Sequence, residues 1–208
     1  MLRSKKNVVR SGSKRGFTLV ELLIVIVVIG VLSAMMMLSS TEAVSSARAN
    51  NIISNLRNLK TAALSFYTDN MNALVVNSNG TQLDLSKIPN SGETGTKWLG
   101  AAINSAPSII TKYLGDNGNL SINGDTNTSN MYCAKGGYAI TSAEQGKVWY
   151  VVYRFADNEG NIKAKINSKA ASIGLLGYNN KIPDSPSLTA ASNTYNNNSY
   201  VLLKVAEI

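Results

Sequence analysis

The chain has 208 residues, a formal net charge of +8, a single cysteine and no histidine. The absence of histidine excludes a Ser-His-Asp triad and histidine-based zinc sites, and a single cysteine excludes an internal disulfide bond. Six of the 20 basic residues precede Gly16, which leaves 14 basic against 12 acidic residues and a side-chain balance of +2 in the rest of the chain. The basic excess therefore belongs mainly to the N-terminal segment and does not by itself indicate a nucleic-acid partner.

An apolar segment follows this basic N-terminus. It covers 22 residues, 17–38, and its one charged residue is Glu21. As an α-helix it would extend roughly 33 Å, enough to cross the apolar layer of a bilayer, which is about 30 Å thick. The basic residues before it predict that the N-terminus stays in the cytoplasm and that the C-terminal part faces outward. A carboxylate inside such a segment is costly, so Glu21 is expected to have a partner for its charge.

The residues KRGFTLVELL, at positions 14–23, resemble the leader and helix start of type IV prepilins and related pseudopilins. The resemblance implies that a membrane prepilin peptidase cleaves after Gly16 and methylates the new N-terminal residue, Phe17, with Lys14 and Arg15 as the basic recognition residues of the leader. It also implies that Glu21 helps to align each subunit with the Phe17 amino group of a neighbour during filament assembly. The chain departs from the family in lacking a proline near residue 38 and a C-terminal cysteine pair, so Gly30 is the remaining candidate for a soft point in the helix.

The charges at the two residues also support a pairing on physical grounds. A free α-amine has a pKa of about 7.7–8.0, so at neutral pH the Phe17 amine would be mostly positive while Glu21 is negative. Glu21 lies four residues after Phe17, so the two groups could pair within one chain. Paired between chains, they would fix the axial stagger of packed helices, because a wrong register would leave a buried charge without a partner.

Two other readings of the N-terminal segment remain open. It could be a secretory signal peptide with a small-residue cleavage site before Val44, or a plain uncleaved membrane anchor. The mature N-terminus separates the three: methylated Phe17 for a prepilin, Val44 for a signal peptide, and Met1 or Leu2 for an anchor.

The polar sequence after the apolar segment stays compatible with a helix. Ile52, Leu56, Leu59, Ala63 and Tyr67 recur at steps of three or four and form one amphipathic face. No proline occurs between residues 17 and 87, so we expect one helix over residues 17–68, with its second part packed on a head domain. The alternative is a hinge at residues 39–41, Ser-Ser-Thr, which are weak helix formers.

The remaining sequence predicts a small head with an antiparallel sheet, and hence an α+β fold. The expected domains are a leader at 1–16, a long helix at 17–68 with 17–38 in the membrane or filament core, and a globular head at 69–208. Within the head we expect loops at 69–80, 116–130 and 193–199, short helices at 98–104, 107–114 and 170–176, and strands at 138–141, 147–155, 161–166 and 200–205, with a turn at 156–160 that makes 147–166 the clearest hairpin.

Candidate ligand sites in the head are weak. The Asp- and Asn-rich segments at 116–119 and 157–161 carry oxygen ligands but lack the spacing of a calcium-binding EF-hand, so ordinary turns are expected. A basic and aromatic neighbourhood near the predicted hairpin suggests contact with DNA, with a solvated strand face as the alternative; its residues are Tyr150, Tyr153, Arg154, Lys163, Lys165 and Lys169. Cys133 is expected to be a small buried apolar residue rather than an intermolecular bridge.

We therefore expect a structural subunit of a helical surface filament rather than an enzyme, with no cofactor and no metal site. The expected partners are copies of the chain and other pilins, the prepilin peptidase, the assembly machinery and the inner membrane, with nucleic acid disfavoured. The precursor is expected in the bacterial inner membrane and the mature chain in a pilus or pseudopilus outside it. A pseudopilin of a type II secretion or competence system is the alternative, because the same leader and helix serve both.

Overall fold

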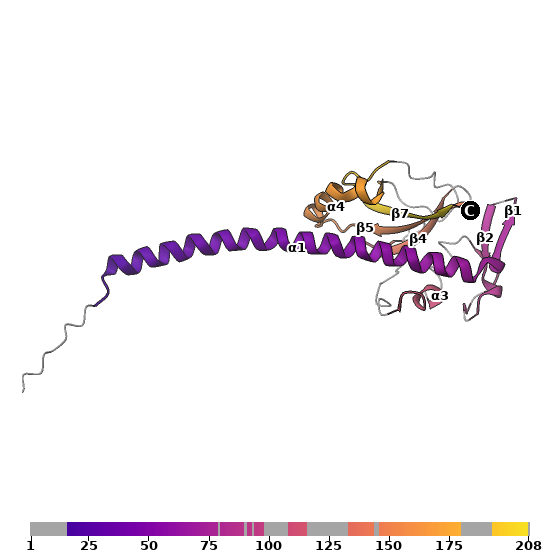
Figure 1. Ribbon diagram of the computed structural model, residues 1–208, viewed down its shortest axis with the longest axis horizontal. Helices are drawn as coiled ribbons and strands as arrows, with labels where there is room; N and C mark the ends of the chain where they lie inside the picture. The colour runs from indigo at the N-terminus through magenta and orange to yellow at the C-terminus, as the bar shows by residue number, and fades with distance from the viewer. Residues whose placement is uncertain are drawn as a thin grey trace, which may run out of the picture. The chain divides into compact units, whose positions relative to one another are not determined.

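The computed structural model describes residues 16–78, 80–89, 91–92, 94–97, 108–115, 133–143, 146–179 and 193–207, apart from the side chains of residues 38, 39 and 108. The chain separates into two compact units, Met1–Glu42 and Ala43–Ile208. The order of elements is a long helix followed by antiparallel strands (Figure 1), which confirms the α+β prediction.

The long helix α1 covers Leu19–Asp69. The predicted range of 17–68 is therefore confirmed to within two residues at each end. Residues 39–41 are helical, so the alternative of a hinge there is wrong, and Gly30 is helical as well. The polar side chains at 39–41 reduce helix propensity by only a few tenths of a kcal/mol each, which helix cooperativity outweighs.

Within Ala43–Ile208, the C-terminal part of α1 supplies one side of the hydrophobic core. Ile52, Leu56, Leu59 and Ala63 are all at most 6% exposed, and Tyr67 packs against the same cluster. The Tyr67 ring meets the Trp149 ring edge to face, with centroids 5.1 Å apart. The predicted amphipathic face is confirmed, and its spacing of three and four residues is the reason that it faces the sheet.

The larger sheet is antiparallel and has the strand order β4-β5-β7-β6. Its strands are β4 (Tyr138–Ala143), β5 (Val148–Arg154), β6 (Leu176–Tyr178) and β7 (Tyr200–Glu207). The strands predicted at 138–141, 147–155 and 200–205 are confirmed, with β7 lying between β5 and β6. Every residue of β4 and all but the last of β5 are buried, as expected of strands rich in β-branched and aromatic residues with both faces covered.

A smaller sheet replaces the loop predicted at residues 69–80. After the 3₁₀ helix η1 (Met71–Ala73), strand β1 (Leu74–Asn77) pairs with β2 (Gly80–Asp84), which continues into η2 (Leu85–Lys87) and pairs with β3 (Thr96–Lys97). The prediction was wrong because it weighed the asparagine and serine content above the run Leu74-Val75-Val76. That run is long enough for a short strand, and Asn77 opposite Gly80 leaves a two-residue hairpin connection.

Helix α4 (Gly160–Ile173) replaces the strand predicted at 161–166, and it contains the first four residues of the helix predicted at 170–176, whose last residue lies in β6. Its buried residues Ile162, Ile166 and Ala170 recur every four residues, a helical period that local alternation of apolar and polar residues concealed. The helix ends at Gly174, whose φ of 75° is left-handed and whose N–H donates to the Ala170 carbonyl. Gly177, the predicted end of the helix, lies in β6.

Other predictions in the head are met in part or fall outside the described residues. The helix predicted at 107–114 is present as the shorter α3 (Ser108–Thr111), with Gly115 at a φ of 56° after it. The segment 193–199 is a loop as predicted, mostly exposed except for the buried Tyr195. The helix predicted at 98–104 and the loop at 116–130 lie outside the described residues.

Cys133 is buried, which confirms the reading as a small apolar core residue. It is 1% exposed, and its Sγ donates a hydrogen bond to the Gly137 carbonyl at 3.1 Å. Burial raises the pKa of the thiol to about 12, so the neutral form dominates at any physiological pH.

We expect Cys133 to react with an aromatic disulfide reagent at least about tenfold more slowly in the folded chain than after denaturation, because the thiolate is the nucleophile. The measurement is the rate of thiol labelling at mildly alkaline pH, with and without guanidinium chloride. Equal rates in the two states would contradict the burial of this side chain.

Candidate processing and assembly site

The start of α1 is closed by a reciprocal cap between Thr18 and Glu21. The Thr18 N–H and hydroxyl donate to Glu21 Oε2 at 2.9 and 3.1 Å, and the Glu21 N–H donates to Thr18 Oγ1 at 3.2 Å. This is a capping box, in which two residues three apart satisfy backbone donors at a helix N-terminus. Thr18 was not among the residues predicted for this site, although the spacing Thr-x-x-Glu before an apolar run is the signal of a capping box.

The capping box fixes where the Glu21 carboxylate lies. It is turned towards the start of the helix, beside the residue that follows Phe17. Within the described part of the chain, only Oε2 of this carboxylate has a hydrogen-bond partner, so Oε1 can accept another donor. The geometry therefore leaves the carboxylate one oxygen for a donor from outside the helix.

The residues of the expected cleavage site are accessible. The Phe17 side chain is 87% exposed, and a side chain built at Gly16 would meet no described atom within 4 Å. Both residues precede the first residue of α1, so the peptide bond between them lies in non-helical backbone that an enzyme can approach. Lys14 and Arg15, the expected recognition residues of the leader, lie outside the described residues.

Among the described residues of the unit Met1–Glu42, the N-terminal part of α1 has no apolar partner. Every large apolar side chain from Phe17 to Met37 is between 50% and 87% exposed. Among the described helices, α1 is the one long and apolar enough to cross a membrane. A continuous apolar surface of this size requires lipid or other protein to cover it, because exposed apolar patches on soluble monomers are rarely more than a few hundred Å².

The basic and aromatic neighbourhood predicted in the head does not form an aromatic surface. Tyr150 and Tyr153 are 1% and 4% exposed, so neither ring can stack on a base while the sheet is folded. The basic side chains are also separated, since Lys163 lies against the Phe155 ring while Lys169 donates to Asn50 Oδ1 at 2.6 Å. Arg154 and Lys163 do line one cavity, together with Lys135.

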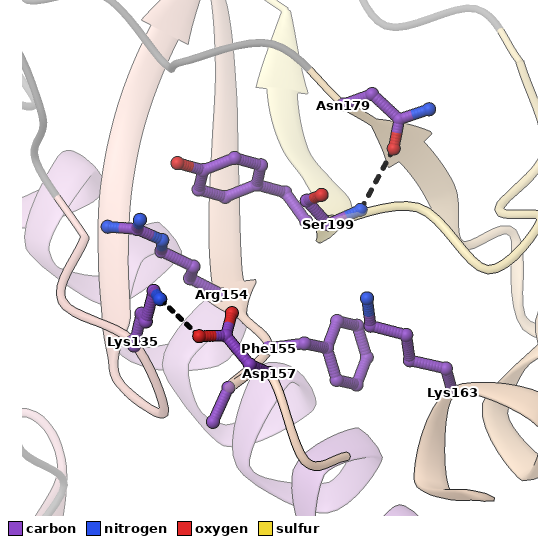
Figure 2. Close-up of a pocket in the computed structure, with 9 residues that line it drawn as sticks. Lys135, Arg154, Phe155, Asp157, Lys163, Asn179 and Ser199 are labelled. Atoms are coloured by element: carbon purple, nitrogen blue, oxygen red, sulfur yellow. Dashed lines mark hydrogen bonds and ion pairs between the residues drawn. The ribbon is translucent and has the colours of Figure 1, made fainter. Parts of the chain in front are cut away.

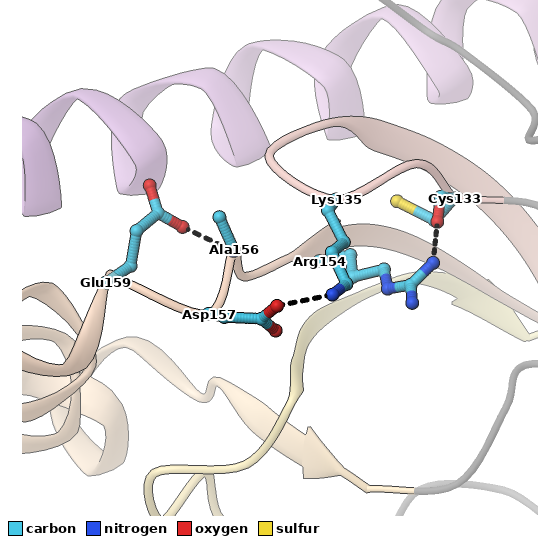
Figure 3. Close-up of polar contacts among 6 residues, drawn as sticks. All are labelled: Cys133, Lys135, Arg154, Ala156, Asp157 and Glu159. Atoms are coloured by element: carbon cyan, nitrogen blue, oxygen red, sulfur yellow. Dashed lines mark hydrogen bonds and ion pairs between the residues drawn. The ribbon is translucent and has the colours of Figure 1, made fainter.

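The carboxylates of the candidate calcium segment at 157–161 have partners within the protein (Figure 3). Asp157 pairs with Lys135, and the Glu159 carboxylate accepts hydrogen bonds from the Ala156 N–H at 2.8 Å and from the Tyr153 hydroxyl at 3.0 Å. The Glu159 contacts tie the end of β5 to the start of α4, and the Asp157 pair joins the same turn to the turn before β4, so both have a structural role. No group of three metal-binding side chains occurs in the described ranges, and the segment 116–119 lies outside them.

Comparison with known proteins identifies the N-terminal segment. Residues 12–37 match the prokaryotic N-terminal methylation motif, the signature of type IV prepilins and pseudopilins. No curated protein and no solved structure matches the chain. The motif covers the leader junction, the capping box and the exposed apolar part of α1, so it coincides with the site described above. It supports a prepilin-type substrate and, together with the apolar helix, fits a precursor anchored in a membrane.

Proposed function

We propose that this prepilin-type chain is a type IV pilin-like structural subunit of a helical surface filament rather than an enzyme. In this proposal the precursor is cleaved between Gly16 and Phe17, and the new Phe17 amine is methylated. The observation that carries the proposal is the coincidence of the methylation motif at 12–37 with the N-terminal part of α1, where every large apolar side chain up to Met37 is at least half exposed. Lipid covers that surface in the precursor, and neighbouring subunits cover it in the filament.

Cleavage would create the charge that completes the site. The new amine at Phe17 stands next to Thr18, whose N–H and hydroxyl already bind Glu21. The Glu21 carboxylate is held in this position with Oε1 available as an acceptor, so it can bind the amine of a neighbouring helix. Because an unpaired charge in an apolar core is costly, pairing the Glu21 carboxylate with the neighbour's Phe17 amine favours one axial register over others.

The proposed domain division follows from this function. A leader at 1–16, with Lys14 and Arg15 recognised by the peptidase, stays in the cytoplasm. The helix at 17–68 forms the filament core with its N-terminal part, and the head at 69–208 faces outward. The proposed partners are copies of the chain and other pilins, the prepilin peptidase and the assembly machinery of the inner membrane, and the proposed destination is a filament outside the cytoplasmic membrane.

The experiment that tests this proposal is deletion of the gene, followed by electron microscopy of surface fibres and an assay of protein secretion in the same cells. We expect fibres to disappear and to return with the wild-type gene. Loss of secretion with fibres intact would instead identify a secretion pseudopilin, which is the alternative that the same motif permits. Unchanged fibres and unchanged secretion would contradict a filament function of either kind.

A further inference from the structure

A cavity of about 240 Å³ lies in the head where β5 ends and β7 begins (Figure 2). Since a water molecule in the liquid takes up about 30 Å³, the cavity has room for a small molecule of several heavy atoms. Its walls come from five separate segments of Ala43–Ile208, namely the turn before β4, the end of β5, the first turns of α4, the end of β6 and the start of β7. The lining residues are Lys135, Arg154, Phe155, Ala156, Asp157, Lys163, Asn179, Ser199 and Tyr200.

The charged side chains of this cavity are mostly cationic. Lys135, Arg154 and Lys163 line it together with a single acid, Asp157. The hydrogen bond and charge of Lys135 lower the pKa of the Asp157 carboxylate, with smaller contributions from the charges of Arg154 and Lys163. Lys135 is the cation that pairs with this carboxylate directly. The nearby acid Glu159 is turned away from the cavity, towards the Tyr153 hydroxyl and the Ala156 N–H. The cavity therefore keeps two positive charges beyond the one that Asp157 balances.

Two of the cations are held in place by contacts that leave donors for a ligand. Arg154 Nη1 donates to the Cys133 carbonyl at 3.0 Å, and its guanidinium lies 5.7 Å from the centre of the Tyr200 ring. Lys163 Nζ lies 5.5 Å from the centre of the Phe155 ring. Figure 2 shows Arg154 and Lys163 on either side of Phe155. An arginine side chain has five N–H donors, and the bond to Cys133 is the one side-chain hydrogen bond that Arg154 makes among the described residues.

Neutral donors stand beside these charges. The Asn179 Oδ1 accepts a hydrogen bond from the Ser199 N–H at 3.0 Å, which fixes the amide so that its NH₂ group is the part left for a ligand. The Ser199 hydroxyl lines the same cavity. The cations and the neutral donors come from separate segments and so approach a ligand from several directions. This arrangement suits the several oxygens of a tetrahedral anion better than the two coplanar oxygens of a carboxylate.

We propose that this cavity binds a tetrahedral oxyanion, phosphate or sulfate, either free or as the monoester of a small molecule. Arg154 and Lys163 hold the anion, the Asn179 amide and the Ser199 hydroxyl supply neutral hydrogen bonds, and Asp157 weakens binding by repelling the ligand. The inference goes beyond the filament function, because it concerns the head alone and does not depend on processing or assembly.

The test is isothermal titration calorimetry on the full chain, with or without the leader, in a maltoside detergent, which carries no phosphate. The ligands are inorganic phosphate, sulfate and glucose 6-phosphate. Each is titrated into the protein in a chloride buffer of the same ionic strength, and chloride alone is the reference injection. We expect binding of at least one of them, weakened about tenfold by Arg154→Gln and by Lys163→Gln, since each variant removes a charged hydrogen-bond donor. Asp157→Asn is expected to tighten binding several-fold, because it removes the repelling charge.

Lys165→Gln is the matched control, because Lys165 lies on the same helix, carries the same charge and does not line the cavity. It is expected to leave affinity within about twofold of the wild type, because salt screens a charge that lies outside the site. Lys163→Gln keeps the test valid if Arg154→Gln does not fold. Binding of the ester but not of the inorganic ions would support the proposal and identify a small phosphorylated molecule as the ligand. Absence of binding by all three ligands, or equal weakening by Lys163→Gln and Lys165→Gln, would overturn it.

Discussion

Replacing Glu21 by glutamine is expected to reduce surface filaments at least about tenfold while cleavage of the leader continues. Glutamine keeps the side-chain length and an oxygen that can accept the Thr18 hydrogen bonds, so the helix cap is preserved. The change removes the negative charge that would pair with the Phe17 amine of a neighbour. A tenfold loss corresponds to about 1.4 kcal/mol, which is modest for an ion pair in an apolar core. The measurements are filament yield after shearing and the mass of the cell-associated subunit.

Two further variants assign the cause of this loss. Glu42→Gln removes the next acid along the same helix, which follows the apolar segment, and is expected to leave filaments unchanged. Thr18→Val removes the hydroxyl of the cap but keeps the carboxylate, and should cost about 1 kcal/mol of helix stability, as other N-cap losses do. If Thr18→Val lowered filament yield as much as Glu21→Gln, the cap rather than the charge would control assembly. Filaments of Glu21→Gln at the wild-type level would contradict the pairing.

Replacing Gly146 by alanine is expected to destabilise the head by about 2–5 kcal/mol, one of the largest effects of a single methyl group in this chain. Gly146 has a φ of 85°, where an alanine costs about 1–2 kcal/mol. A Cβ there would also lie 2.1 Å from the Thr81 carbonyl oxygen, so the smaller sheet would have to move, and overpacking of this kind costs about 1–3 kcal/mol more. The measurement is denaturant unfolding of the mature chain in detergent, followed by tryptophan fluorescence.

Trp149 is a suitable probe for this experiment because it is buried and its Nε1 donates to the Gly146 carbonyl at 3.0 Å. The matched control is Gly174→Ala, since Gly174 has a similar φ of 75° and an added Cβ would meet nothing within 4 Å. Gly174→Ala should lower the free energy of unfolding by only the cost of placing an alanine in left-handed backbone, about 1–2 kcal/mol. If the two variants lost the same stability, the close approach of Thr81 to Gly146 would not exist in the folded chain.

The parts of the fold that sequence reasoning predicted are those with long and consistent periodicity. The helix over Leu19–Asp69 carries an apolar run and then a face of buried residues at helical spacing, and β5 carries seven β-branched, aromatic or basic residues between clear turns. In both, local propensity and burial favour the same structure. The boundaries were correct to within a few residues because turn residues or a change in composition mark them.

The errors occurred where local pattern and tertiary packing disagree. Residues 161–166 alternate apolar and polar side chains like a strand, which would bury Ala164 on the same face as Ile162 and Ile166. Ala164 is exposed, and the buried residues recur every four positions, as they do in a helix. Strand β1 is short and surrounded by turn residues, and its pairing with β2 decides its structure. Such pairings depend on contacts that a single sequence does not reveal.

The candidate sites show the same contrast. The leader junction and Glu21 could be predicted from the sequence because their signal lies within ten consecutive residues, 14–23. Arg154 and Lys163 were noted as basic, but their shared cavity depends on Asn179, Ser199 and Lys135, which come from other segments of the head. Tyr150 and Tyr153 were noted as aromatic, yet the sheet buries both. Exposure and convergence of side chains are properties of the folded chain that spacing in sequence does not give.

The most direct measurement of the central claim is the mass of the N-terminal peptide of the mature chain, purified from membranes and from sheared fibres. We predict that this peptide begins at Phe17 and carries one methyl group on its amine. A chain with Gly16→Asp serves as the control, because it should keep the leader and yield no fibres. An N-terminus at Met1, Leu2 or Val44 in the wild-type chain would contradict processing as a prepilin, and with it the proposed assembly through Phe17 and Glu21.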